Sequence, residues 1–132
     1  MIVDTSVWFD SSNGHLSSQA HRLNQEIKDN EAIGIPGLVV TEILLGLQNE
    51  LEAKRIAQLL EAFTDVPEPN RADHIAAAAL YRTCRSKGVT TRSTIDCVIA
   101  QLCLRDRQAL LAKDRDFDRI AEQIELKLVA VR

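Results

Sequence analysis

Four acidic side chains stand at positions where a soluble protein rarely leaves a carboxylate unpaired. Asp4 and Asp114 each follow a short apolar run, and Glu42 and Asp96 have apolar residues at helical spacing around them. Moving an unpaired carboxylate out of water costs several kcal/mol. Four of them inside one fold are therefore tolerable only if they are protonated, paired with basic groups or bound to cations. Oxygen clusters of this kind suit Mg²⁺ or Mn²⁺, so the pattern predicts a divalent-metal site.

Such a site could carry out phosphodiester hydrolysis. Carboxylates that hold one or two Mg²⁺ or Mn²⁺ ions can polarise a phosphodiester, activate a bound water and stabilise the leaving oxygen. Arg92 lies in the loop before Asp96. Because a guanidinium binds phosphate oxygens bidentately, Arg92 is a candidate substrate contact.

Each acid taken alone has a simpler explanation. A capping Asp is common at a strand-to-helix junction, which would account for Asp4 or Asp96. Glu42 could be a surface residue, and Asp114 could pair with a neighbouring basic residue, Lys113 or Arg115. Four acids at compatible ends of four predicted elements make coincidence the weaker account.

The elements that position these acids alternate between strands and helices. Apolar runs predict strands at residues 2–3, 32–35 and 109–112, a minor strand at 64–66 and a closing strand at 126–131. Helical spacing of apolar residues predicts helices at residues 15–30, 38–47, 50–63, 71–87 and 95–107, with a short helix after Asp4 and another through Ile124. The expected N-caps are Thr5 or Ser6 for the helix after Asp4 and Thr94 for the helix at 95–107. Gly88 is expected to end the helix at 71–87.

One of these helices is ambiguous, because residues 38–47 include several β-branched side chains that favour a strand. Its length and its position after Pro36 favour a helix. On that helix Glu42 would share a stripe with Leu38, Val39 and Leu45. Asp96 would lie in the first turn of its own helix, in line with buried apolar residues.

Alternation of strands and helices predicts the α/β class, with a parallel sheet covered by helices on both faces. In such sheets ligands bind beyond the carboxyl ends of the strands, where Asp4 and Asp114 are expected.

The chain of 132 residues has the size and composition of a single domain spanning residues 1–132. It shows no signal peptide and no apolar run long enough to span a membrane, so we expect a soluble, cytoplasmic protein without a membrane partner. The three cysteines have no metal-site spacing and are expected to be reduced and partly buried.

The net charge of −3 conceals an uneven distribution. Residues 1–70 carry 4 basic and 11 acidic groups, whereas residues 71–119 carry 10 basic and 6 acidic groups. The basic segment contains two of the four acids, so a bound metal would make it more positive. A polyanionic substrate is one interpretation of this segment, but from charge alone a solvated charged face is the simpler one.

Four short motifs, in this order, resemble PIN-domain ribonucleases, specifically the VapC-type toxins of bacterial and archaeal toxin–antitoxin pairs. The motifs are IVDTS at residues 2–6, TEILLG at 41–46, STIDCVIA at 93–100 and LLAKDRDFDRIA at 110–121. The resemblance covers nearly the whole chain, and residues 15–30 match only by pattern. It implies a three-layer α/β/α PIN-like domain with a short, mostly parallel central sheet.

The resemblance also implies roles for individual residues. The acidic quartet that would be catalytic and hold the metal consists of Asp4, Glu42, Asp96 and Asp114, with Asp116 as an additional metal ligand. The hydroxyls that would orient these acids belong to Thr5, Ser6 and Thr94. The implied activity is Mg²⁺- or Mn²⁺-dependent cleavage of structured RNA such as transfer RNA. The implied partners are a VapB-like antitoxin, whose C-terminal segment lies beside the site, and a second copy of the chain in a homodimer or a higher assembly.

Two other functions remain to be weighed. A phosphatase of the haloacid dehalogenase type also begins with Asp after a strand, but it requires a second Asp at the position of Ser6. A catalytically silent PIN-like binding domain would use the acids only to shape a surface. Such a domain would neither bind Mn²⁺ nor lose activity when Asp4 is replaced.

Overall fold

A computed structural model describes residues 1–131, in which four parallel strands are surrounded by seven helices. The strands are β1 (Ile2–Val3), β2 (Gly34–Ile35), β3 (Thr64–Asp65) and β4 (Leu110–Leu111), in the order β3-β2-β1-β4. The helices are α1 (Thr5–Ser12), α2 (Ser18–Lys28), α3 (Gly37–Leu45), α4 (Glu50–Leu60), α5 (Arg71–Ser86), α6 (Thr94–Arg105) and α7 (Arg115–Gln123). Helix lies at residues 38–45, so the ambiguous segment is helical as expected.

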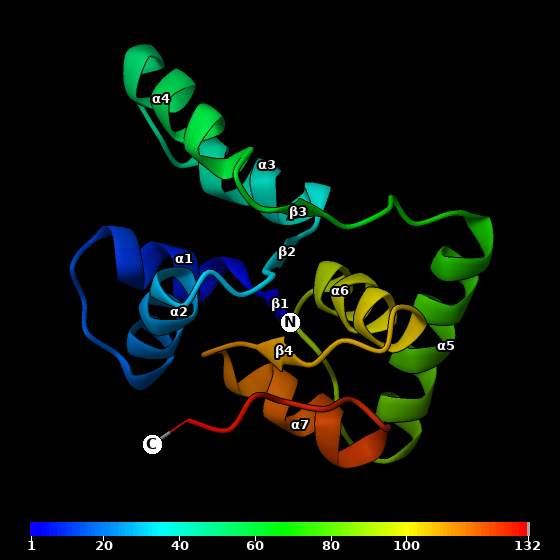
Figure 1. The fold of residues 1–132 in the computed structure, drawn as a ribbon. Coiled ribbons are helices and arrows are strands. Elements are labelled where there is room, and N and C mark those ends of the chain that lie inside the picture. The colour runs from blue at the N-terminus through cyan, green and yellow to red at the C-terminus, as the bar shows by residue number, and fades with distance from the viewer. Residues whose placement is uncertain (132) are drawn as a thin grey trace.

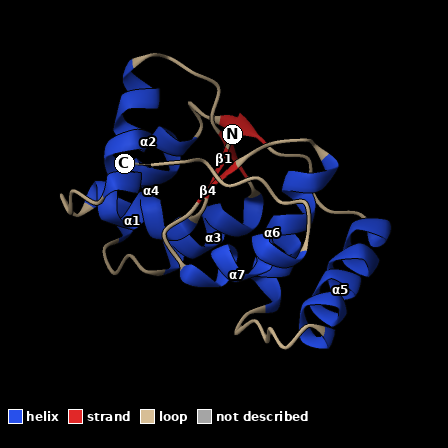
Figure 2. Ribbon diagram, turned by 90° about the horizontal axis from the view of Figure 1, so that it is seen from below, coloured by secondary structure: helices blue, strands red, loops and turns tan. Residues whose placement is uncertain are grey.

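The helices form layers on both sides of the sheet. Figure 1 shows α1 and α2 on one side and α5 and α6 on the other, and Figure 2 shows the same separation from below. Helices α3 and α4 extend away from the sheet beyond β2 and β3 (Figure 1). This arrangement confirms the predicted three-layer α/β/α class with a short parallel sheet.

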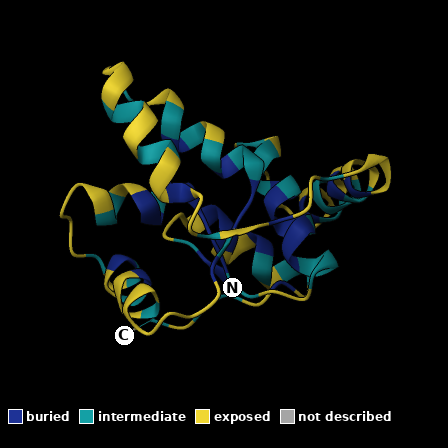
Figure 3. Cartoon of the chain, turned by 45° about the horizontal axis from the view of Figure 1, so that its top comes forward, coloured by how far each residue is buried: buried dark blue, intermediate teal, exposed yellow. Residues whose placement is uncertain are grey.

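Strands β1 and β4 are fully buried, which explains why they read as continuous apolar runs, whereas Thr64 and Asp65 of the edge strand β3 are exposed. Ile2 of β1 pairs with Gly34 on one side and with Leu110 on the other. The side chains of β1 and β4 are at most 1% exposed. They belong to one core cluster that runs from Ile2 to Leu126 in sequence. Figure 3 shows the buried residues gathered in the middle of the molecule and the exposed residues on the outer helices and loops.

Two predicted helix caps are wrong by one or two residues. Asp4, with extended backbone angles, caps α1 by accepting a hydrogen bond from the Ser6 backbone N–H, and Thr5 is the first helical residue. Ser93 caps α6 by accepting from the Ile95 N–H, and Thr94 is the first helical residue. In each case the cap is the last residue with extended backbone angles before the helix, and its side-chain oxygen accepts a hydrogen bond from a free N–H of the first turn.

The predicted closing strand at residues 126–131 is also wrong. This segment forms a single parallel bridge between Leu128 and Leu110. Leu110 N–H donates to the Lys127 carbonyl at 2.9 Å, and Val129 N–H donates to the Leu110 carbonyl at 2.8 Å. Because β4 is only two residues long, it presents one residue's N–H and C=O on this side and supports no longer ladder.

The other predicted helices are present, although some begin or end at different residues. Helix α2 starts at Ser18 rather than at residue 15, since Ser17 caps it. Gly88 has a φ of +82° just after α5, as expected for a left-handed helix end. The three cysteines are free and buried. Among residues 1–131, none of the helices has the length and apolar character that crossing a bilayer requires.

Gly34 provides a test of the sheet packing. A Cβ added at Gly34 would lie 3.0 Å from Val66 Cγ2 and 3.3 Å from Ile2 Cγ1, both on buried side chains. We expect Gly34→Ala to lower the free energy of unfolding by about 1–3 kcal/mol, because the core must shift to admit the methyl group. Gly46→Ala is the control, because its Cβ would have only ordinary contacts, the nearest at 3.7 Å to Phe9. Equal urea midpoints for the two variants would contradict this account of the sheet.

Candidate metal centre

Asp4 lies at the carboxyl end of β1 and caps α1. Its Oδ2 accepts a hydrogen bond from the Ser6 hydroxyl at 2.9 Å and from the Ser6 N–H at 3.4 Å. The residue is 8% exposed, and burial raises the pKa of its carboxyl even though the Ser6 hydrogen bonds act in the opposite direction. These two hydrogen bonds orient the Asp4 carboxylate, and the supporting role in the site that the resemblance implies for Ser6 stays a prediction.

Asp114 and Asp116 come from the loop after β4 and the first turn of α7. Because β4 pairs with β1, and Asp4 N–H donates to the Leu111 carbonyl at 2.9 Å, this loop lies beside Asp4. Asp114 caps α7 by accepting from the Asp116 N–H at 2.9 Å. Asp114 is exposed, whereas Asp116 is 3% exposed.

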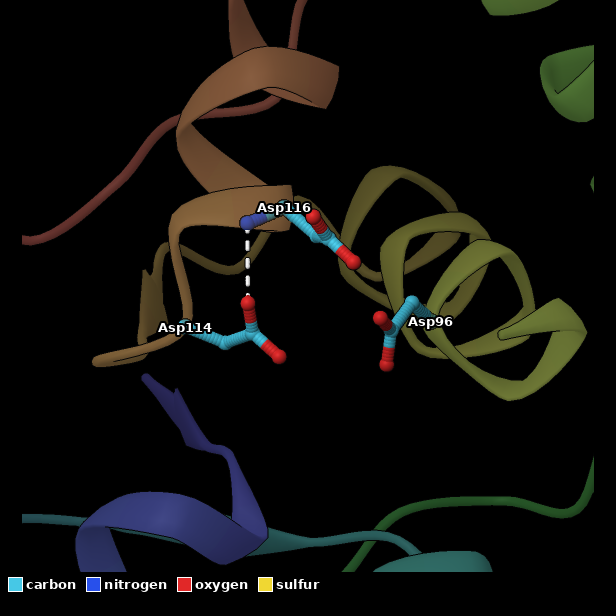
Figure 4. A group of neighbouring side chains, drawn as sticks. All are labelled: Asp96, Asp114 and Asp116. Atoms are coloured by element: carbon cyan, nitrogen blue, oxygen red, sulfur yellow. Dashed lines mark hydrogen bonds between the residues drawn. The ribbon is translucent and has the colours of Figure 1, made fainter. Parts of the chain in front are cut away.

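Asp96 completes a close group of three carboxylates. It lies in the first turn of α6, and the residues that the sequence aligns with it, Ile99, Ala100 and Cys103, are all fully buried. One carboxylate oxygen from each of Asp96, Asp114 and Asp116 lies within 4.8 Å of the other two. Figure 4 shows these three side chains pointing toward one another from α6 and α7. An oxygen-only donor set at this spacing suits a hard divalent cation.

The negative charges of the other four acids act on the Asp96 carboxyl. Burial, followed by the negative charges of Asp4, Asp114, Asp116 and Glu42, raises the pKa of the Asp96 carboxyl to about 7. Among residues 1–131, the acids of this group have one ion pair, between Arg92 and Asp116. The carboxylates are thus brought together without a matching number of basic partners.

Glu42, on α3, is not one of the three carboxylates whose oxygens lie within 4.8 Å of one another. The Thr5 hydroxyl donates to Glu42 Oε1 at 3.0 Å, which ties α3 to α1. The predicted stripe through Leu38, Val39 and Leu45 is not buried along its length, because Leu45 is 73% exposed. The Thr5 contact, rather than a buried apolar stripe, orients Glu42.

Of the remaining predicted site residues, Arg92 lies at the group and Thr94 does not contact it. Arg92 Nε is 3.4 Å from Asp116 Oδ2, and its side chain is 82% exposed. Thr94 is exposed, and in the described part of the chain its hydroxyl forms no hydrogen bond with any of the five acids. The orienting role that the resemblance implies for Thr94 therefore has no contact to support it.

Lys113, a basic residue next to Asp114 in the chain, forms its ion pair outside the group of acids. Lys113 Nζ is 2.8 Å from Asp10 Oδ2, and this contact holds the pKa of the Asp10 carboxyl below its usual range. The Lys113 N–H also donates to the Ser6 hydroxyl at 3.4 Å. Lys113 was a candidate partner of the adjacent Asp114, whereas its ion pair with Asp10 was not predicted. No local pattern links two residues so far apart in the chain.

Comparison with known proteins decides the family, because the PIN domain family model matches residues 1–123. The chain is a PIN domain. This PIN domain is 30% identical to VapC ribonuclease Mb1587 of Mycobacterium bovis and to ribonuclease VapC11 of Mycobacterium tuberculosis, over 100% of this chain and 99% of each relative. These matches confirm the resemblance to the VapC-type proteins.

Solved structures show the same fold for the PIN domain. VapBC2 from Rickettsia felis bound to a DNA fragment from their promoter matches with a TM-score of 0.73 at 17% identity, over 97% of this chain and 96% of that one. VapBC-1 from nontypeable Haemophilus influenzae matches with a TM-score of 0.74 at 20% identity, over 97% and 95%. The catalytic and metal-binding roles of Asp4, Glu42, Asp96 and Asp114 stay predictions.

The pKa of Asp96 makes the stability of the PIN domain depend on pH. A pKa raised from 3.8 to about 7 means that the folded state binds this proton more tightly than the unfolded chain does. The resulting stabilisation is fully present below the ordinary value of 3.8 and is lost as the pH rises through about 7. In the presence of a chelator, we therefore expect Tm to be several degrees higher at about pH 5 than at about pH 8.

Asp96→Asn should flatten this dependence, because the amide carries no charge at either pH. Asp118→Asn is the matched control, since Asp118 is an exposed acid on α7 outside the close group. Differential scanning fluorimetry across the pH range measures both effects. An undiminished pH dependence in Asp96→Asn would show that the repulsion does not centre on Asp96.

Proposed function

We propose that this PIN domain is a Mg²⁺- or Mn²⁺-dependent endoribonuclease that acts as the toxin of a toxin–antitoxin pair. The observation that carries the proposal is the group of carboxylates at the ends of β1 and β4, three of which have oxygens within 4.8 Å of one another. The full-length relatives are named VapC ribonucleases, which supports RNA as the substrate. Structured RNA such as transfer RNA is the proposed target.

The residues have distinct roles in this proposal. Asp96, Asp114 and Asp116 would hold the cation, and Asp4 and Glu42 would complete the acidic site. A bound Mg²⁺ or Mn²⁺ supplies charge that polarises the phosphodiester and makes a bound water acidic. Ser6 and Thr5 keep Asp4 and Glu42 oriented through their hydroxyls. Arg92, exposed at the rim, is available to contact an RNA phosphate.

The partners in this proposal are a VapB-like antitoxin, RNA and a second copy of the chain, in a homodimer or a higher toxin–antitoxin assembly. The structural neighbours are VapBC complexes, which supports an antitoxin partner. Helices α3 and α4 leave large apolar side chains in water, with Leu45 at 73%, Leu51 at 80% and Leu59 at 54% exposed. Such a surface is suited to cover by a partner segment.

Metal binding can be tested without any substrate. We expect Mn²⁺ to raise Tm of the wild-type protein, because a cation that binds only the folded state stabilises that state. At a Mn²⁺ concentration of 100 Kd, the free energy of unfolding should rise by about 2.7 kcal/mol. Asp96→Asn and Asp114→Asn should lose this stabilisation, and Asp118→Asn should keep it. Titration calorimetry should show the same order. If the stabilisation persists in Asp96→Asn, the cation binds elsewhere.

Activity is tested by inducing expression in cells and mapping RNA ends by sequencing. The wild type should arrest growth and produce defined cuts. We expect Asp4→Asn to reduce cleavage by about a hundredfold or more, since even residues that only support metal ligands cost about ten- to a hundredfold. Asp118→Asn should cut as the wild type does. Growth arrest with identical RNA ends in Asp4→Asn, or arrest without any cuts, would favour the silent binding domain instead.

A further inference from the structure

Helices α5 and α6 enclose a groove of about 460 Å³ that lies apart from the group of carboxylates. The two helices pack along each other (Figure 1). The apolar part of the lining comes from Ala77, Ala78, Cys97 and Val98. Small and flat surfaces of this kind leave room for a planar group between the helices.

The polar part of the lining is basic. Arg82, Arg85 and His74 border the groove, and among residues 1–131 no acidic residue lines it. Arg82 and Arg85 are exposed, and neither pairs with a carboxylate in the part of the chain that the structure describes. Their charges are therefore available to a ligand, and an anionic ligand suits them.

Tyr81 adds an aromatic ring to the same groove. The Arg85 guanidinium lies over this ring, 5.6 Å from its centroid. Aromatic rings and guanidinium planes are surfaces on which nucleobases stack, and phosphates bind the cationic side chains beside them. A ligand that is anionic along its length and carries flat apolar groups satisfies every part of this lining, and single-stranded RNA has both features.

The groove and the candidate metal centre both include residues from the start of α6. Thr94 lines the groove, and Asp96, two residues later, belongs to the group of carboxylates. The separation is about one helix diameter, on the order of 10 Å, which a few nucleotides can span. Arg92 precedes this turn and contacts Asp116, so a basic side chain lies beside the centre at the start of α6.

We propose that the groove between α5 and α6 binds single-stranded RNA next to the bond that is cut, with Arg82 and Arg85 on phosphates and Tyr81 against a base. This inference rests on the proposed ribonuclease function. It makes Arg82, Arg85 and Tyr81 substrate-positioning residues at a distance from the metal centre. A second copy of the chain fits the groove less well, since a two-fold axis there would bring the arginines of one subunit toward those of the other.

The test measures binding separately from cleavage. In an Asp96→Asn background, which prevents cutting, fluorescence anisotropy with a labelled RNA of about 12 nucleotides measures Kd at several salt concentrations. We expect Arg82→Gln with Arg85→Gln to raise Kd about tenfold and to reduce the slope of log Kd against log salt by about 1.4, which is about 0.7 for each lost phosphate contact. Tyr81→Leu should raise Kd with no change of slope. Lys54→Gln with Arg71→Gln removes the same charge from exposed sites outside the groove and should leave Kd within about twofold.

Further readouts separate this inference from the proposed function. With Asp96 intact, the double arginine variant should raise KM for RNA and leave kcat within about twofold, since it acts on binding away from the metal. Arg82→Lys with Arg85→Lys preserves the charge and should restore most of the affinity. If the double arginine variant leaves Kd unchanged, or if the Lys54 and Arg71 control weakens RNA binding equally, the groove is not the RNA-binding site. This holds even if the wild-type protein cuts RNA.

The proposed function fails independently if wild-type protein cuts no RNA, whatever the anisotropy shows. Sedimentation velocity of the same variants gives the remaining outcome. If the double arginine variant changes from dimer to monomer while its Kd for RNA stays that of the parent, the groove is a subunit interface and the inference is wrong. Melting temperatures confirm that each variant is folded before binding is compared.

Discussion

The repulsion among carboxylates at the end of the sheet is the constraint on which the rest of the structure depends. Burial and the charges of four other acids raise the pKa of Asp96 to about 7. The fold must hold these side chains together against that repulsion. Two of them double as helix caps, because Asp4 and Asp114 accept hydrogen bonds from backbone N–H groups at the starts of α1 and α7. The same backbone contacts that begin the helices thus offset part of the cost of the site.

The surrounding contacts keep basic groups from filling the centre. Lys113 is next to Asp114 in sequence, but its ammonium group pairs with Asp10 on α1. On the other side, Arg105 at the end of α6 pairs with the buried Asp73 at the start of α5 at 2.8 Å and donates to the Pro67 carbonyl at 2.8 Å. This second network joins the ends of α5 and α6. It therefore helps to hold together the two helices that form the walls of the basic groove that we propose for RNA.

Much of the fold could be predicted from the local pattern of apolar residues. The wrong predictions, a closing strand and two helix caps, concern features that pairing partners and backbone geometry decide. The helices at 50–63 and 71–87 were identifiable because apolar spacing and end signals agree within one segment. The closing strand failed because residues 126–131 alternate suitably, yet β4 offers only one residue for pairing. The caps at Thr5 and Thr94 failed because several adjacent polar residues could serve, and backbone geometry selects Asp4 and Ser93. Thr94 accordingly faces the groove rather than the acids.

The sequence by itself determined which side chains could do chemistry: acids after apolar runs and in the first turns of helices, in an order typical of PIN domains. Those features are local, so they survive without coordinates. Only the tertiary structure decided that Asp116 joins Asp96 and Asp114 in the close group, and that Lys113 pairs with Asp10. It also brought Arg82, Arg85 and Tyr81 together with α6 in one groove. The pairing of β1 with β4 and the packing of α5 on α6 create these contacts between residues far apart in the chain, and no single segment encodes them.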